Sequence, residues 1–479
     1  MSEAASTRVA LAKSTTSRKT NRRHTTSTTG TTALLPSLVP LLHEWVPRQR
    51  WFAGKGQPVT GFSLVAATEI LPLDAAGTGP GLLHLLVRVH QPGSRPADSL
   101  GDCYQLLLGV RTTLPPLLAD ARIGQVTEGP LAGRTLYEGL HDPRVADLLL
   151  ERFRNPGSLG PLRFDRAEPI PPDLTPRFLD TEQSNSSLVY GDALILKIFR
   201  RVFPGTNPDL ELPLALGREG CGRVPAPVAW FEATTSPEPL TLGVLQPFLR
   251  GAQDGWQLAL AALAAGRDFV PEAHALGRAT AEVHTALAAA LPTPPLAHDR
   301  ARHVVAGMVE RLEAAARAVP ALVPYVPGLR TAFDAVAELG GPGHGWAAQR
   351  VHGDLHLGQT LRGADGFWSL IDFEGEPARP LPERRSPQPT VRDVAGMLRS
   401  FDYAARSHHP WNPEWAARCR AAYCEGYARA AGSDPRAEPE LLRAHETDKA
   451  VYEVLYEARH RPDWLPVPMA AIQRLAAPA

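Results

Sequence analysis

Two carboxylates and one amide stand close together in the last third of the chain, in a pattern suited to phosphoryl transfer. Asp354 lies five residues before the amide Gln359, and Asp372 follows a short apolar strand. Transfer of a phosphoryl group from ATP requires a carboxylate that orients and deprotonates an acceptor hydroxyl, together with oxygen ligands that hold magnesium against the phosphates. We therefore expect Asp354 to act as the catalytic base, and Gln359 and Asp372 to bind Mg²⁺.

The histidines around Asp354 extend this pattern toward the catalytic loop of protein kinases. That loop separates its catalytic Asp from a metal-binding Asn by five residues and carries a His two residues before the Asp. Here His352 precedes Asp354 by two residues, and His356 lies within the loop. Since hard magnesium prefers oxygen ligands, we expect both histidines to shape the loop and to border the acceptor substrate rather than to bind the metal.

An apolar strand far upstream carries a lysine. Residues 193–199 have the pattern of a strand in which Lys197 shares a face with two apolar side chains. An ammonium group on such a face needs an anionic partner, although a lysine at a sheet edge can also extend into water. Because the strand precedes the Asp354 loop, as in kinases, we expect Lys197 to bind ATP phosphates. Its expected partner is Glu211, in the first turn of a helix, with Glu219 as the alternative.

A polar segment stands where protein kinases have a glycine-rich loop over the phosphates of ATP. No Gly-x-Gly-x-x-Gly pattern precedes the lysine strand. Hydroxyls and backbone amides of a polar segment can cover phosphates as glycines do elsewhere. An ordinary polar turn is the equally weighted alternative. The segment consists of Gln183, Ser184, Asn185, Ser186 and Ser187.

The expected hinge between two lobes follows the lysine strand. The apolar run 240–248 leads into a largely helical region that begins near residue 255. A kinase hinge in this place binds adenine through backbone groups, so its side chains reveal little. We expect Gln246 and Phe248 to border the adenine.

A helix near the C-terminus carries a stripe of polar and aromatic side chains. Asp448, Tyr452, Tyr456 and Arg459 recur at i, i+4, i+8 and i+11, and Glu453 stands beside them. Such a stripe suits a sugar, because flat sugar faces stack on rings while hydroxyls seek paired hydrogen bonds. We expect this stripe to bind the acceptor, and a solvated helix face with partly packed tyrosines is the alternative.

Length, charge and cysteine content narrow the class of protein. A chain of 479 residues exceeds one ordinary core and predicts two or three units. Lys plus Arg and Asp plus Glu are both 50, so no overall field attracts nucleic acid or an anionic membrane, and we expect a small-molecule partner. Four cysteines without metal-type spacing favour a reducing, cytoplasmic location. No apolar run approaches the roughly 20 residues that a membrane span needs.

The N-terminal part of the chain contributes no expected chemistry. The first 32 residues are rich in Ser, Thr, Lys and Arg and have scarcely any large apolar side chain. This mixture buries too little surface to offset the cost of ordering, so we expect a disordered tail. Further on, Lys55 between two glycines evokes a phosphate loop. The upstream glycine and the following Ser or Thr of a Walker A motif are absent, so we expect a structural turn there.

Six motifs, in order from about residue 34 to the C-terminus, resemble those of the maltokinase family. They are QRWFAGKG at 49–56, QSNSS at 183–187, the Lys197 strand, HGDLHLGQ at 352–359, IDFEGEP at 371–377 and YEVLYEAR at 452–459. The resemblance implies an α+β, two-lobed eukaryotic-protein-kinase-like fold, with a β-rich N-lobe bearing an N-terminal cap subdomain and a mostly α-helical C-lobe, related to aminoglycoside phosphotransferases. It also implies ATP-dependent phosphorylation of maltose at its anomeric hydroxyl to maltose 1-phosphate, which feeds glucan and glycogen synthesis.

The resemblance further implies a division of the chain and a set of partners. We expect a tail at 1–32, the cap at 33–150, the rest of the ATP-binding lobe and the hinge at 151–250, and the helical lobe at 251–479. The expected substrate and cofactors are maltose, ATP and Mg²⁺, and association with trehalose-synthase or glucan-pathway enzymes is a further expectation. The basic tail and the Pro-rich stretch 377–389 depart from the family pattern.

Two other functions stay open at this point. A related kinase of an aminosugar or aminoglycoside would need a dense acidic pocket, whereas the stripe mixes Arg459 with acids, which favours a neutral sugar. A nucleotide-binding pseudokinase that regulates a partner enzyme is the third function. The intact base Asp354 and both metal positions speak against it.

Replacing the expected base tests its role directly. Asp354→Asn should lower kcat by about 10²- to 10⁴-fold, because an amide cannot accept the hydroxyl proton. Turnover is measured by ADP release, and circular dichroism with thermal unfolding checks that the fold is retained. An Asp354→Asn protein with full activity would exclude Asp354 as the base.

Overall fold

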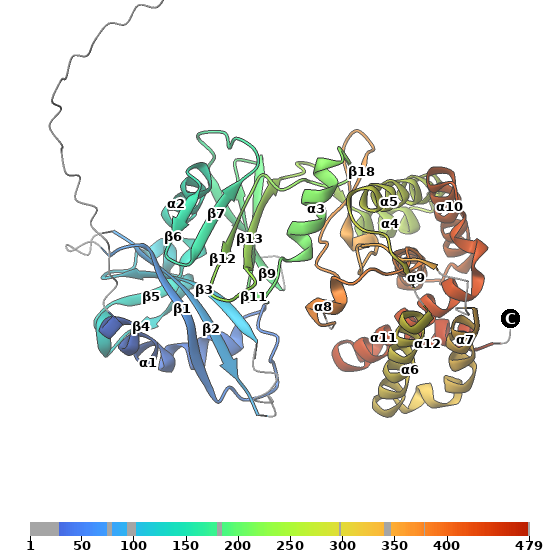
Figure 1. Cartoon of the computed structure of the whole chain (residues 1–479), viewed down its shortest axis with the longest axis horizontal. Helices are drawn as coiled ribbons and strands as arrows, with labels where there is room; N and C mark the ends of the chain where they lie inside the picture. Colours follow the sequence, from blue (N-terminus) through green and yellow to red (C-terminus); the bar gives the residue numbers. More distant parts are fainter. Residues whose placement is uncertain are drawn as a thin grey trace, which may run out of the picture.

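The computed structural model confirms the predicted α+β, two-lobed fold. It describes residues 28–73, 79–92, 102–179, 184–296, 298–339, 346–377 and 379–477. Two sheets lie on one side of the molecule and most helices on the other (Figure 1). The expected tail lies outside the described residues up to residue 27, and α1 (Thr28–Trp45) begins five residues before the expected boundary at 33.

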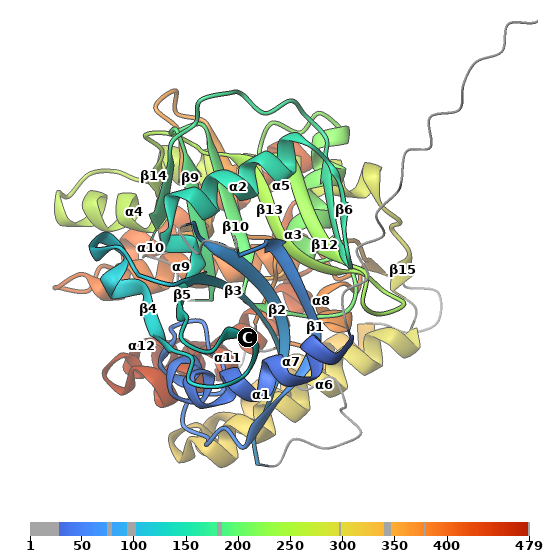
Figure 2. The same ribbon diagram turned by 90° about the vertical axis from the view of Figure 1, so that its left-hand side faces the viewer.

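The cap is a sheet whose central strands are apolar on both faces. Leu83 and Leu85 of β2 share a core with α1, whereas Leu82 and Leu86 share a core with the neighbouring sheet. Because successive side chains of a strand point to opposite faces, one apolar run fills two cores. Figure 2 shows α1 at the outer side of these strands. The strand order is β1 (Gly61–Leu71), β2 (Gly81–His90), β3 (Cys103–Arg111), β5 (Thr135–Glu138) and β4 (Arg122–Gln125).

The segment between α1 and β1 forms the expected structural turn. It follows the short helix η1 (Val46–Arg48), and Gly56 has a φ of 85° there. Lys55 is exposed at the surface of the cap. The segment 49–56 is therefore not a phosphate loop.

The second sheet contains the predicted lysine strand. Its β9–β10 hairpin turns at Gly191 and Asp192, which both have a φ of 53°. Tyr190 pairs with Leu194, so three residues connect the strands, and the amide of Ala193 closes the turn on the carbonyl of Tyr190 at 3.0 Å. The strand order is β6 (Gly157–Leu159), β7 (Leu162–Arg166), β12 (Ala229–Ala233), β13 (Leu240–Pro247), β10 (Leu194–Phe199), β9 (Asn185–Tyr190) and β8 (Pro176–Leu179).

Three further elements connect this N-lobe to its surroundings. α2 (Pro143–Arg154) packs into the core of the second sheet. β11 (Arg201–Val202) pairs with β3 of the cap. α3 (Pro208–Arg218) lies between the two lobes (Figure 1). Its N-terminus brings acidic side chains toward the space that the lysine strand faces.

The C-lobe is mostly helical, and none of its described helices is both long and apolar enough to cross a bilayer. Its main helices are α4 (Gly255–Ala264), α5 (Val270–Ala290), α6 (His298–Ala318), α7 (Val326–Leu339), α8 (Leu381–Arg384), α9 (Val391–Ser407), α10 (Pro413–Ala431), α11 (Pro439–His460) and α12 (Pro466–Ala476). Its short strands and turns are β14 (Gln253–Asp254), β15 (Pro295–Leu296), β16 (Trp346–Ala347), η6 (Leu357–Gln359), β17 (Thr360–Arg362), β18 (Trp368–Leu370) and η8 (Pro462–Trp464).

Helices α5 and α10 cross at two glycines. A Cβ added to Gly277 would lie 1.9 Å from the backbone oxygen of Tyr423, and one added to Gly426 would lie 2.0 Å from a backbone oxygen of α5. This close approach lets His284 of α5 bond to the hydroxyl of Tyr427 on α10 at 2.9 Å. The crossing therefore sets the position of a histidine that supports the site.

Adding a methyl group at the crossing should destabilise the C-lobe. Gly277→Ala must push the two backbones apart, which costs about 1–3 kcal/mol or more. A lower Tm by thermal unfolding checks this expectation. Gly307→Ala, inside α6, is the control, because its added Cβ meets the flexible end of Arg311 at 3.2 Å and alanine favours a helix. Equal Tm values for the two variants would contradict the role of the crossing.

Candidate active site

The catalytic loop is held from behind by one buried carboxylate. Asp393, at the start of α9, accepts hydrogen bonds from the backbone amides of His352 and Gly353, both at 2.8 Å. His284 Nε2 lies 3.0 Å from the same carboxylate. Burial by itself raises the pKa of Asp393, but the bonds with His284 and the amide of Gly353 hold it below its usual value. Asp393 therefore braces the catalytic loop, and His284 is a buried core histidine with a partner for each ring nitrogen.

The two loop histidines take different places. His352 is 1% exposed, and its Nε2 donates to the carbonyl of Ile371 at 2.9 Å. It therefore joins the catalytic loop to the segment that bears Asp372, and its expected place beside the acceptor is wrong because the ring is buried. His356 Nδ1 accepts from the amide of Gly358 at 3.1 Å, and burial lowers the pKa of His356.

Lys197 and Asp372 meet between the lobes as expected. Lys197 Nζ lies 2.6 Å from Asp372 Oδ1, and Gln359 Nε2 donates to Asp372 Oδ2 at 2.8 Å. Asp372 has a φ of 65°, a left-handed conformation that costs a non-glycine residue free energy and is common at functional sites. Burial alone would raise the pKa of Asp372, but the ammonium of Lys197 holds it below its usual value.

The expected partner of Lys197 on α3 is wrong by two residues. Asp209 Oδ2 lies 2.8 Å from Lys197 Nζ, and Asp209 Oδ1 accepts from the amide of Phe373 at 2.7 Å. Glu211 instead pairs with Arg350 at 2.7 Å. Two residues on a helix differ by about 200° in direction, so Glu211 points away from the lysine. The alternative, Glu219, is exposed at the end of α3 and does not reach it.

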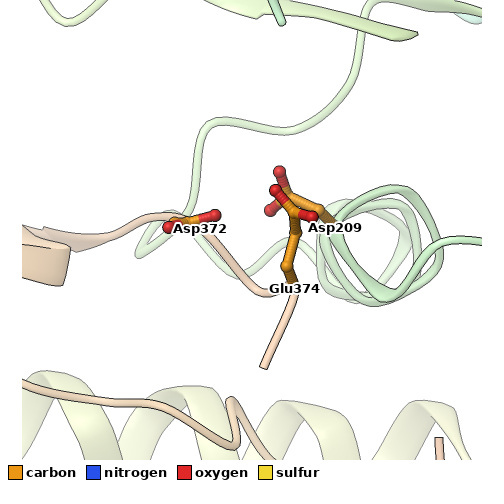
Figure 3. A group of neighbouring side chains, drawn as sticks. All are labelled: Asp209, Asp372 and Glu374. Carbon is orange, nitrogen blue, oxygen red and sulfur yellow. The ribbon is translucent and has the colours of Figure 1, made fainter. Parts of the chain in front are cut away.

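Three carboxylates surround the lysine and provide oxygen ligands. Oxygen atoms of Asp209, Asp372 and Glu374 all lie within 4.8 Å of one another (Figure 3). Glu374 Oε1 lies 2.8 Å from Lys197 Nζ, and burial raises the pKa of Glu374. One ammonium faces three acids, and carboxylate and amide oxygens are the ligands that Mg²⁺ prefers. The residues present, including the amide oxygen of Gln359, therefore fit a magnesium ion.

The polar segment divides between the two faces of a strand. Gln183 lies outside the described residues, and Ser184 is exposed just before β9. Asn185 Nδ2 donates to Glu374 Oε1 at 2.7 Å, and Ser187 lies opposite Lys197 in the β9–β10 register. Ser186 points to the other face, where its Oγ accepts a hydrogen bond at 2.8 Å from a buried arginine. The expectation that Ser186 covers phosphates is therefore wrong.

The hinge residues lie where expected, at the end of β13. Gln246 and Phe248 are both partly buried, and Gln246 pairs with Ile195 of β10. The amide of Phe248 donates to the carbonyl of Ala193 at 2.9 Å, and its carbonyl accepts from the amide of Arg250 at 2.9 Å. The backbone amide of Phe248 is therefore engaged within the chain, which does not fit its expected use for adenine, while the carbonyl keeps a second lone pair.

A pocket of about 440 Å³ opens beside the catalytic loop, and we call it the acceptor pocket. Lys449 of α11 is in its wall and donates to Asp354 Oδ1 at 2.8 Å, which connects the expected base to the pocket. Burial alone lowers the pKa of Lys449, but Asp354 and Glu376 raise it above its usual value. The lining side chains include Asp254, Trp256, His356, Tyr403, Lys449, Glu453, Tyr456, Glu457, Arg461 and Trp464.

The expected stripe on α11 is only partly in this pocket. Tyr456 and Glu453 line it, and Tyr452 stacks on Tyr456 with ring centroids 6.2 Å apart. Asp448 is buried on another side and is paired with Arg311 at 2.8 Å and with a second arginine, so its expected contact with sugar is wrong.

Arg459 is exposed and does not line the acceptor pocket, so its expected contact is also wrong. The face of α11 that does line the pocket carries Lys449, Glu453, Tyr456 and Glu457, spaced i, i+4, i+7 and i+8. This spacing was present in the sequence and would have found Lys449 and Glu457. Trp464 lies in η8, directly after α11, whereas Trp256 and Tyr403 come from α4 and α9, and no local sequence signal relates these two to α11.

Comparisons with known proteins agree with this geometry. A family model described as the maltokinase N-terminal cap domain matches residues 45–142. A glucosamine kinase of Streptacidiphilus jiangxiensis is 31% identical over 323 residues, which cover 61% of this chain and 71% of the relative. A glucosamine kinase of Mycolicibacterium smegmatis is 30% identical over 318 residues, which cover 62% of this chain and 79% of the relative. The chain belongs to the glucosamine kinase family. It is therefore a sugar-phosphorylating kinase that uses a nucleotide. The predicted enzyme class is confirmed.

Solved glucosamine kinase structures share the fold of this family member over most of its length. One, in complex with glucosamine, ADP and inorganic phosphate, has a TM-score of 0.64 at 24% identity and covers 91% of this chain and 98% of that chain. Another crystal form has a TM-score of 0.66 at 23% identity, with the same coverage of 91% and 98%. The cap, the N-lobe and the C-lobe thus recur as one arrangement.

The pairing of Lys197 with Asp209 can be tested against its neighbour on α3. Asp209→Asn should lower kcat/KM for ATP by about tenfold or more, because a buried ammonium loses a charged partner. Steady-state kinetics with varied ATP check this expectation. Glu211→Gln is the control, since the amide oxygen can still accept from Arg350. A larger loss in Glu211→Gln than in Asp209→Asn would restore the sequence-based assignment.

Proposed function

We propose that the protein is an ATP-dependent maltokinase that transfers the γ-phosphoryl group to the anomeric hydroxyl of maltose and releases maltose 1-phosphate and ADP. The observation that carries this proposal is the charge balance of the acceptor pocket. Glu453 pairs with Arg399 at 2.7 Å, and Glu457 pairs with Arg461 at 2.6 Å. Because both carboxylates already have a guanidinium partner, the pocket suits a neutral acceptor better than a cationic one.

The apolar part of the acceptor pocket supports a sugar. Trp256, Tyr403, Tyr456 and Trp464 supply aromatic faces, and Tyr456 is 38% exposed. Rings of this kind stack on the flat faces of hexoses, while the polar tips bond hydroxyls. The volume of about 440 Å³ lies within the roughly 300–1,000 Å³ of small-ligand pockets. The maltokinase-type cap on the N-lobe and the resemblance of the chain's motifs to maltokinases add to this support.

The reaction follows from the positions of the chain's own groups. Asp354 accepts the proton of the sugar hydroxyl while the new O–P bond forms and the bond to ADP breaks. Lys449, which lines the acceptor pocket, holds the carboxylate of Asp354 at 2.8 Å and so fixes the base beside the pocket. Lys197 pairs with the phosphates. Mg²⁺, when bound by Asp372 and Gln359, offsets the negative charge of the phosphate oxygens.

Phosphorylation of glucosamine is the second candidate function. The relatives at 31% and 30% identity are glucosamine kinases. Asp254 is a third carboxylate of the acceptor pocket, and its Oδ1 caps α4 by accepting from the amide of Gln257 at 2.8 Å. It carries no guanidinium partner among the described residues, so it is the group that an amino substituent would meet.

A panel of acceptors separates the two functions. ADP release from Mg-ATP is measured with maltose, glucose, glucosamine and an aminoglycoside. Maltose should give the highest kcat/KM, and a phosphate ester at the anomeric carbon identifies the product. Turnover with glucosamine and none with maltose would replace the first proposal by the second.

Variants of α11 locate the acceptor. Tyr456→Ala should raise the KM for the sugar by up to about tenfold. Stacking of the sugar on the tyrosine ring contributes up to about 1.5 kcal/mol, and about 1.4 kcal/mol corresponds to a factor of ten. The KM for ATP should change less than twofold. Arg459→Ala is the matched control from the same helix, since Arg459 lies outside the acceptor pocket. An effect of Arg459→Ala as large as that of Tyr456→Ala would contradict this location.

A further inference from the structure

Arg200 is a buried cation at the seam between the cap and the N-lobe. It directly follows β10, three residues after Lys197, and is 1% exposed. Its guanidinium carbon lies 5.2 Å from the centroid of the Trp51 ring, and its Nη2 lies 3.1 Å from Glu138 Oε2. A buried charge is costly unless it is paired. Both partners belong to the cap, so side chains of the cap pair with a buried cation of the N-lobe.

The contact between Trp51 and Arg200 gives a structural role to the QRWFAGKG segment at 49–56, which the proposed reaction does not use. Trp51 packs against the rings of Trp45 and Tyr104, with centroid distances of 5.7 Å in both cases. The amide of Ala53 donates to the hydroxyl of Tyr104 at 3.2 Å. These contacts hold the face of the indole toward the guanidinium. The segment therefore places the Trp51 ring against Arg200, while its neighbour Phe52 packs into the cap core against Tyr104.

The other side of Arg200 reaches a strand that borders the nucleotide site. Arg200 Nε donates to Ser186 Oγ at 2.8 Å, and Ser186 is 5% exposed. Asn185 and Ser187 flank Ser186 on β9 and point to the opposite face, on which Lys197 lies across the hairpin. A shift of Ser186 therefore moves both flanking residues relative to Lys197.

Hydrogen bonds on either side of Arg200 fix the seam in place. The side-chain amide of Gln105, a fully buried residue of β3, donates to the carbonyls of Phe199 and Leu242. The backbone amide of Gln105 donates to the carbonyl of Arg200 at 2.9 Å. β11 continues this pairing with β3. The cap and the end of β10 are thus held together, and Arg200 cannot change its place independently of the cap.

We propose that the cap positions the nucleotide-binding face of the N-lobe, and that Arg200 is the positioning residue that links Trp51 and Glu138 of the cap to Ser186 of β9. The proposal rests on the nucleotide half of the proposed function, which is the binding of phosphates at Lys197, and not on the choice of sugar. Arg200 acts through Ser186 and touches no reacting group. Cutting this link weakens nucleotide binding and leaves sugar binding unchanged.

Ser186→Ala and Arg200→Met test the link. Ser186→Ala should weaken the Kd for Mg-ADP about five- to tenfold, because a charge-assisted hydrogen bond is lost. Isothermal titration calorimetry with Mg-ADP measures this without any sugar. The KM for ATP should rise by a similar factor, while the KM for the acceptor stays within twofold. Arg200→Met keeps apolar packing, and the double variant should lose no more than Arg200→Met alone, since both residues act through one contact.

Arg201→Gln is the matched control at the same seam. Arg201 Nε donates to Asp102 of the cap at 2.7 Å, and its side chain is 34% exposed. This variant should lower Tm slightly and leave the Kd for Mg-ADP within twofold.

An unchanged Kd in Ser186→Ala, or an equal loss in Arg201→Gln, overturns the proposal. If Arg200→Met does not fold, Ser186→Ala decides alone. If the unmodified protein binds Mg-ADP but phosphorylates none of the tested sugars, the proposed function fails while the comparison of Kd values still decides the role of the cap.

Discussion

The site depends on one ammonium group that three carboxylates share. Lys197 comes from the N-lobe sheet, Asp209 from α3, and Asp372 and Glu374 from the segment after β18. Attraction between such charges is much stronger in a partly buried cleft than in water, so the lysine draws separate elements of both lobes to one point. The same arrangement leaves an excess of negative charge. It therefore joins the two lobes and leaves carboxylate oxygens that fit a divalent cation.

The C-lobe holds the other reacting group from two directions. The carboxylate of Asp393 fixes the catalytic loop because it accepts hydrogen bonds from two backbone amides of that loop. The side chain of Asp354 takes no part in these bonds. Lys449 then meets Asp354 from α11 and bonds Glu376 at 3.2 Å on its other side. Because Lys449 also lines the acceptor pocket, α11 both borders the proposed acceptor site and holds the carboxylate of the proposed base Asp354.

The sequence predicts residues whose roles depend on their spacing along the chain. It does not predict residues whose roles depend on the direction in which a side chain points. Gln359, Asp372 and Lys197 converge as their order and spacing predict, and Asp354 lies on the loop next to them, where it meets Lys449. The choice between Asp209 and Glu211 was missed because it turns on about 200° of helix rotation. The place of Ser186 was missed because the polar segment continues into a strand, in which alternate residues change face.

The acceptor side shows the same limit. The i, i+4, i+8 stripe found Tyr456 but included Asp448, which faces the interior and pairs with arginines from α6 and from the segment before α8. The aromatic partners Trp256 and Trp464 lie about 200 residues apart in the sequence, and only the packing of α4 against the other helices relates them. Long-range contacts of this kind leave no local periodicity to read.

The cap strands that are apolar on both faces also affect how the chain folds during its synthesis. Their inner side is covered by residues of the second sheet, and Gln105 finds its acceptor Leu242 137 positions later. During synthesis, which proceeds from the N-terminus at about 5–20 residues per second, Leu82 and Leu86 must wait for that later segment to leave the ribosome. The nascent cap therefore passes through a stage with an uncovered apolar sheet, the kind of intermediate that chaperones shield.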